Sequence, residues 1–309
     1  MPALDPTPVI SIRPLVIPVP GRGDDLQIRV SAPAEGSDLP VIVMAHGFGL
    51  DLTAYDPLVD HWTAHGFVVV QPTFLDSASL GVAPTDPRYP TIWEVRVDDL
   101  VRVLDGLPRL LDALPGLAER VDLDRIALAG HSWGAQSIGM LLGARVIGAD
   151  GTPGESRLDP RVSAGVLLAA TGIGGDDLSP FAQENFAFMS PEFDSLTVPS
   201  IVVAGDHDQS MLSSRGPDWF TDVYRLSPGA RHLVTLFGGE HSLGGIQAYG
   251  STQTTDESPE RVALVRETTT AFLRTALGVD DGAWARVAAA VSAGAGAASA
   301  GAVGRIDSK

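Results

Sequence analysis

Apolar residues in this chain gather in short continuous runs, separated by longer segments in which they recur every three or four positions. Such short runs are typical of strands that are covered on both faces. In the segment Ile92–Leu107 the apolar spacing is instead that of a helix packed on a sheet. The alternation predicts an α/β fold with a mostly parallel central sheet and helices on both faces. The runs are Leu39–Ala45, Phe67–Val70, Arg125–Ala129, Val162–Ala170, Ser200–Ala204 and Leu233–Phe237.

The alternation continues to a last predicted helix near the C-terminus. Ser258 and Pro259 are a strong helix start, and Gly278 marks the end of the pattern. We therefore expect one domain over residues 1–278. The remaining tail, residues 279–309, is rich in Ala and Gly, and this low complexity predicts poor order.

One strand-to-helix junction carries a serine between glycines. Gly130-His131-Ser132-Trp133-Gly134 follows a buried strand run and precedes a helical segment that extends to about Val146. On such a tight turn the serine has a strained backbone, glycines let the turn close, and the hydroxyl is exposed at the sheet edge. The helix N-terminus beside it favours the negative charge of acyl transfer. We predict Ser132 as a nucleophile, with a glycine-rich turn and a capping serine as the alternative.

A serine hydroxyl needs a base at neutral pH. His241 lies just past the last predicted strand, where a loop can carry its imidazole over the serine. His232 starts that strand, and His61 and His65 fall on an early predicted helix. His131 lies beside the nucleophile, where packing or bracing of the loop suits it better. We predict His241 as the base, and a structural histidine is the alternative.

The base in turn needs an acid that orients it. The run Ser200–Ala204 leads into Gly205-Asp206-His207-Asp208. Asp208 is far enough along the loop to reach the histidine, so we predict it as the acid. Asp206 is nearer the strand end and is expected to brace the turn, but it stays an alternative. Three consecutive residues do not easily converge on one ion, so we expect no metal here.

Acyl transfer also requires two backbone N–H groups that hold the oxyanion. One is expected from Trp133, directly after the nucleophile. The other is expected from Phe48, in the loop His46-Gly47-Phe48-Gly49 after the strand Leu39–Ala45. Glycines there let the backbone approach the reacting carbonyl. An ordinary strand-end turn is the alternative interpretation of this loop.

These four segments resemble the α/β-hydrolase superfamily over about residues 8–277, with the expected order Ser132, Asp208, His241. Within it the chain is most similar to the chlorophyllase-like branch, which is similar to bacterial cutinase-like polyester hydrolases and platelet-activating-factor acetylhydrolases. The segment Trp93–Leu100 supports that branch. The resemblance implies an α/β-hydrolase fold and a serine esterase with a Ser-His-Asp triad and an oxyanion hole.

The composition limits the classes of partner and of chemistry that this chain can have. The chain has 38 acidic and 21 basic residues and a formal net charge of −17, which argues against binding to nucleic acids or anionic membranes. It has no cysteine, so disulfides, thiolate metal sites and a cysteine nucleophile are excluded. The N-terminus lacks a secretory pattern and no apolar run reaches spanning length. We expect no membrane insertion and a cytoplasmic location.

The predicted mechanism is hydrolysis of carboxylic esters through an acyl-enzyme, with no organic cofactor. Leu50, Phe74 and Leu243 are expected to line the substrate site. Residues 171–198 are too few for a large lid, so we expect an accessible cleft for a small or polymeric ester.

The natural ester and the oligomeric state stay open. Because a fold does not fix a reaction, a cofactor-free perhydrolase or lyase with the same triad is one alternative. A non-catalytic scaffold that binds a small ligand is another. The presence of nucleophile, base, acid and both oxyanion loops in order disfavours that scaffold.

Overall fold

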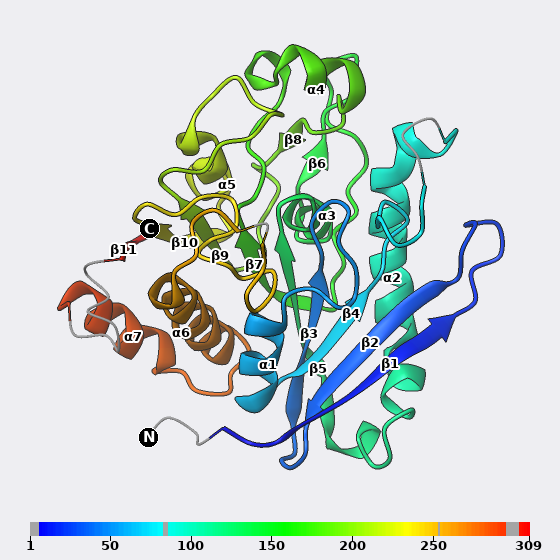
Figure 1. The fold of residues 1–309 in the computed structure, drawn as a ribbon, viewed down its shortest axis with the longest axis vertical. Helices are drawn as coiled ribbons and strands as arrows, with labels where there is room; N and C mark the ends of the chain where they lie inside the picture. Colours follow the sequence, from blue (N-terminus) through cyan, green and yellow to red (C-terminus); the bar gives the residue numbers. More distant parts are fainter. Residues whose placement is uncertain (1–5, 83–85, 253, 295–302) are drawn as a thin grey trace.

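A nine-stranded sheet forms the framework of the molecule (Figure 1). The computed structural model describes residues 6–82, 86–252, 254–294 and 303–309. In spatial order the strands are β1 (Val9–Ile17), β2 (Leu26–Pro33), β4 (Val68–Pro72), β3 (Leu39–Ala45), β5 (Val121–His131), β7 (Val162–Leu168), β9 (Ser200–Gly205), β10 (Ala230–Leu236) and β11 (Gly304–Ser308). The strands from β4 to β10 pair in parallel, and β1, β2 and β11 pair antiparallel at the two sides. The strands β6 (Arg145–Val146) and β8 (Pro191–Glu192) form a small second sheet.

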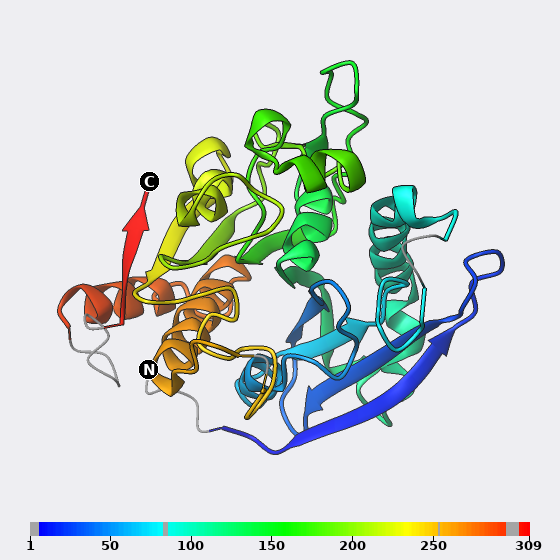
Figure 2. The ribbon, with the colours of Figure 1, turned by 45° about the horizontal axis from the view of Figure 1, so that its top comes forward.

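Helices cover both faces of the large sheet. They are α1 (Asp56–Ala64), α2 (Ile92–Leu111), α3 (Trp133–Leu141), α4 (Pro180–Asn185), α5 (Asp222–Leu226), α6 (Pro259–Ala276) and α7 (Ala283–Ser292). α1 contacts α6 and α2 contacts α3, and these two pairs lie on opposite sides of the sheet (Figure 2). The predicted α/β-hydrolase fold class is confirmed. Within the described ranges, the helices are too short or too polar to cross a bilayer.

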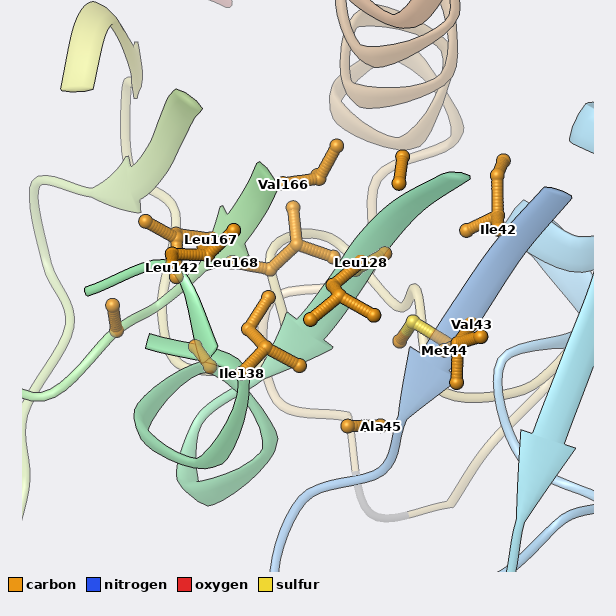
Figure 3. Close-up of a cluster of buried hydrophobic side chains, with 14 of the residues drawn as sticks. Ile42, Val43, Met44, Ala45, Leu128, Ile138, Leu142, Val166, Leu167 and Leu168 are labelled. Carbon is orange, nitrogen blue, oxygen red and sulfur yellow. The ribbon is translucent and has the colours of Figure 1, made fainter. Parts of the chain in front are cut away.

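The core explains why the strands are continuous apolar runs. Every residue of β3 is buried, because α3 covers one face of the central strands and α6 the other (Figure 3). Ile138 within α3 and Leu142 just after its end pack against the strands, and both are fully buried. A strand with two apolar faces has no polar alternation, so it appears in the sequence as an unbroken apolar run.

The last long helix begins where its capping residues place it. The Ser258 Oγ atom accepts a hydrogen bond from the Arg261 N–H at 3.2 Å, and Pro259 occupies the first helical position. The hydroxyl thus satisfies one backbone donor that the helix itself leaves unpaired. The predicted start of this helix agrees with the structure.

The described part of the C-terminal tail differs from the expected poor order. It contains helix α7 and strand β11, and β11 pairs with β10 from His232–Ser308 to Leu236–Gly304. Residues 295–302 lie outside the described residues. Alternating apolar residues are sparse in β11, so its sequence carries little strand signal, and its backbone hydrogen bonds to β10 determine its conformation.

Candidate active site

Ser132 lies on a strained turn between β5 and α3. Its backbone has φ 55° and ψ −120°, a conformation that residues with a side chain rarely adopt. A Cβ atom added to Gly130 would lie 2.4 Å from the Gly134 carbonyl oxygen. One added to Gly134 would lie 2.1 Å from the Ala45 carbonyl oxygen. The two flanking glycines are therefore required for the close approach that holds the serine in this conformation.

The structure brings Ser132, Asp208 and His241 together. The Nε2 atom of His241 is 2.8 Å from the Ser132 Oγ atom, and its Nδ1 atom is 3.0 and 3.1 Å from the two Asp208 carboxylate oxygens. An ionised carboxylate only accepts hydrogen bonds, so Nδ1 donates and Nε2 is left to accept from the serine hydroxyl. The three residues follow β5, β9 and β10, which are parallel and end at one edge of the sheet.

The two candidate acids occupy different positions. The Asp208 side chain is fully buried beneath the His241 ring. Burial raises the pKa of Asp208, and the hydrogen bond from His241 acts in the opposite direction. The Asp206 carboxylate instead accepts the Gly238 N–H at 2.6 Å. Asp206 thus braces a turn, as its position near the strand end predicts, and the described residues hold no cluster of three metal-ligating side chains.

The two predicted oxyanion donors lie after the neighbouring strands β3 and β5. Phe48 follows β3 and Trp133 is the first residue of α3. Their aromatic rings stack, with centroids 5.4 Å apart. Within the described part of the chain, neither backbone N–H has a protein acceptor. Both donors are therefore available to a ligand.

A chain of hydrogen bonds connects the Phe48 loop to the His241 loop. The Gly47 N–H donates to the Tyr55 hydroxyl at 2.9 Å, and that hydroxyl lies 2.9 Å from His131 Nδ1. His131 Nε2 lies 2.8 Å from the His241 carbonyl oxygen. A carbonyl only accepts, so Nε2 carries the proton, Nδ1 accepts from the tyrosine, and the imidazole is neutral. Burial lowers the pKa of His131 to about 3, which keeps this tautomer uncharged.

The sequence gives no signal for a second brace of the histidine loop. The buried Asp256 carboxylate accepts the backbone N–H of Glu240 at 2.8 Å and of Gly244 at 2.9 Å. These two donors lie on either side of His241. Asp256 stands in a polar stretch between predicted elements, where a turn or capping role is the ordinary interpretation. Its role comes only from the three-dimensional fold.

Two of the three predicted substrate-lining residues have no exposed side-chain surface in this structure. Phe74 and Leu243 are fully buried, and Leu50 is partly buried against the core. Phe74 lies under the Phe48 loop, where its N–H donates to His46 Nε2 at 2.9 Å. These residues are close to the reactive loops in sequence, but their side chains point into the protein.

Aromatic residues that the sequence analysis missed surround Trp133 instead. Phe186 and Phe188, between β7 and β9, have ring centroids 6.1 and 5.6 Å from that of Trp133. Phe181 extends this cluster and is 44% exposed, and Phe48 at its other side is 54% exposed. The sequence signal for this cluster is the pair Phe186 and Phe188, two aromatic residues with one residue between them. The segment places an aromatic surface, built from short elements, beside the serine turn.

The strand order, the strained serine turn and the hydrogen-bonded acid and base loops define an α/β-hydrolase. Residues 22–145 match the family model of chlorophyllase, which lies within that superfamily. The match covers less than half of the chain: it includes the Phe48 loop and Ser132 and ends before Asp208 and His241. A search of curated proteins found no matching relative. The chain is thus a hydrolase of the α/β-hydrolase type, and its predicted resemblance to chlorophyllases is confirmed over these residues.

The serine turn gives a first prediction. We expect Gly134→Ala to abolish labelling of Ser132 and to destabilise the protein by about 3 kcal/mol, because the new methyl group would overlap the Ala45 carbonyl. The measurement is fluorophosphonate labelling beside urea unfolding. The control is Gly139→Ala in the same helix, whose added methyl group meets nothing closer than 4.0 Å. That variant should gain roughly 0.5–1 kcal/mol, and equal behaviour of the two variants would contradict the prediction.

The buried histidines give a second prediction. Burial lowers the pKa of His46 to about 4 and that of His131 to about 3, from 6.5. Between these folded-state pKa values and 6.5, the unfolded chain binds more protons than the folded chain. The stability that the two neutral histidines contribute is therefore fully present above pH 6.5, and it is lost as the pH falls toward the folded-state values. We expect the urea midpoint to fall between about pH 7 and 5, above the range where most carboxyl groups titrate. Because burial also lowers the pKa of His61 and His232, His131→Gln should make this profile shallower without abolishing it, and an unchanged profile would contradict the assignment.

Proposed function

We propose that this chain hydrolyses carboxylic esters through an acyl-enzyme on Ser132. The observation that carries the proposal is the continuous hydrogen-bond chain from the Ser132 hydroxyl through His241 to the buried Asp208 carboxylate. This arrangement activates a hydroxyl that is otherwise a weak nucleophile. The strained serine turn supports the same function, because it exposes the hydroxyl beside a helix N-terminus.

Acylation begins with proton transfer. His241 Nε2 takes the hydroxyl proton of Ser132 while the Ser132 Oγ atom attacks the ester carbonyl. Asp208 holds the imidazole in the required tautomer. The backbone N–H groups of Phe48 and Trp133 bind the oxyanion of the tetrahedral intermediate. The intermediate collapses when the protonated His241 gives its proton to the leaving alcohol.

Deacylation uses the same groups. Water attacks the acyl-enzyme while His241 accepts one of its protons, and the acid product leaves when the proton returns to Ser132. The acid and the base differ in their exposure to solvent. The Asp208 side chain has no exposure, whereas the His241 side chain is 38% exposed. Water and an ester can thus reach the base, while the acid stays shielded.

The aromatic surface supports an ester with an apolar acyl or alcohol group. Phe48 is 54% exposed and Phe181 is 44% exposed, and ring contacts through Phe186 and the buried Trp133 connect them. Exposed aromatic rings bind apolar groups over a large area. Between β7 and β9 the added elements are all short, namely a 3₁₀ turn at Gly175–Asp177, α4 and β8. This favours an accessible site for a small or polymeric ester. We propose a cytoplasmic location and no metal or organic cofactor for this reaction.

A serine-specific reagent tests the proposal. A fluorophosphonate should label the folded wild-type protein once, and Ser132→Ala should lose both the label and the hydrolysis of p-nitrophenyl esters. A panel of these esters with increasing acyl length then measures the preference for apolar groups. A folded protein that takes no label and cleaves no ester would contradict the proposal and favour a ligand-binding scaffold.

The two aspartates give an independent test. Asp208→Asn should lower kcat by about 10⁴-fold, because an amide favours the wrong tautomer of His241. Asp206→Asn is its matched control. The Asp206 carboxylate accepts the Gly238 N–H and lies 4.0 Å from His207 Nε2, so kcat should stay near the wild-type value and stability should fall by about 1 kcal/mol. Steady-state kinetics and urea unfolding measure both effects. The reverse pattern would exchange the two assignments.

A further inference from the structure

We propose that the buried Arg96–Asp76 ion pair is the positioning device of the oxyanion hole. This inference rests on the proposed ester hydrolysis and names the residues that hold its two backbone donors in place. Arg96 projects from α2, and Asp76 lies in the loop after β4. Both side chains have no solvent exposure, and Arg96 Nη1 is 2.6 Å from Asp76 Oδ1.

The pair contacts the first oxyanion loop on both sides of Phe48. Arg96 Nη2 donates a short hydrogen bond to the His46 carbonyl oxygen. Asp76 Oδ2 accepts the Gly49 N–H at 3.4 Å. The backbone before and after Phe48 is therefore attached to the same pair of charges.

The pair also contacts the second oxyanion donor. Arg96 Nε donates to the Ser137 hydroxyl at 2.9 Å, and that hydroxyl donates to the Trp133 carbonyl at 2.8 Å. The guanidinium carbon lies 5.2 Å from the centroid of the Trp133 ring, within range of a cation–π contact. One guanidinium group thus connects the first turn of α3 with the loop after β3.

Stability alone does not explain this arrangement. Replacing a buried ion pair by apolar residues of similar volume is often neutral or stabilising. A guanidinium group, however, has five N–H donors in a rigid fork, and Arg96 uses them on three different partners. A lysine can neutralise Asp76 but cannot make all three bonds. The geometry therefore points to a positioning role, since oxyanion donors act only when they are aimed at the developing charge.

A second buried pair on the same helix provides a matched control. Arg22 and Asp99 approach to 2.7 Å, and their side chains are 1% and 0% exposed. Asp99 lies on α2, one turn from Arg96. Arg22 otherwise donates to the carbonyl oxygens of Asp24 and Thr73, and none of these partners belongs to either oxyanion loop. Loss of this pair should affect folding stability without moving the oxyanion donors.

The experiment compares Arg96→Lys with Arg22→Lys. For each variant we measure kcat and KM for a p-nitrophenyl ester, the inhibition constant of an alkyl trifluoromethyl ketone and the melting temperature. The ketone forms a tetrahedral adduct whose oxyanion needs both donors, whereas KM reports mainly ground-state binding. Arg96→Lys should lower kcat and the affinity for the ketone, each by about 10²-fold, with little change in KM. Arg22→Lys should lower the melting temperature similarly and leave kcat and ketone affinity near the wild-type values.

Equal kcat and equal ketone affinity in the two variants would overturn the inference, and so would a loss of kcat in Arg96→Lys without weaker ketone binding. If Arg96→Lys does not fold, Ser137→Ala removes only the connection to Trp133. It should lower kcat and ketone affinity by about tenfold, and unchanged values would overturn the inference. Failure of the proposed hydrolysis is recognised separately, because the wild-type protein would then react with neither the fluorophosphonate nor the ketone.

Discussion

The common direction of the central strands is the constraint on which the candidate site depends. β3, β5, β9 and β10 run parallel, so the loops that follow them open at one edge of the sheet. Each loop contributes one residue to the candidate site, namely Phe48, Ser132, Asp208 or His241. Since the strands are buried on both faces, their ends have little freedom to move. Residues more than a hundred positions apart in the chain therefore meet at hydrogen-bonding distance.

Below this edge, polar groups that do not touch a substrate hold the loops. Asp256 fixes the two sides of the His241 loop, and the Tyr55–His131 pair connects that loop with Gly47. Each of these groups is buried and bonded to the backbone. Such buried hydrogen bonds are stronger than they would be in water, and the loss of a partner is costly in a medium of low dielectric constant. The geometry of the candidate site thus depends on side chains inside the protein as well as on Ser132 and His241 themselves.

Much of this arrangement could be predicted from the sequence, because parallel strands and tight turns have strong local signals. An apolar run predicts strand β3, and flanking glycines predict the serine turn at Ser132. A capping serine predicts the start of α6. The direction of a side chain has no such signal. Phe74 and Leu243 lie near the reactive loops and yet point inward. Arg96 stands between two valines of α2, where a charged residue suggests a solvated face, and only the folded structure buries it.

The C-terminal strand changes how the sheet meets other molecules. Without β11, the edge of the sheet would be β10, whose end leads directly into the loop that carries His241. With it, the outermost strand carries Arg305, which is paired with Asp307 at 3.0 Å, and both side chains are largely exposed. Charged residues on an edge strand oppose the addition of a strand from another chain. Intermolecular sheet growth, and the distortion of the neighbouring loop that would follow, is thereby discouraged at this side of the protein.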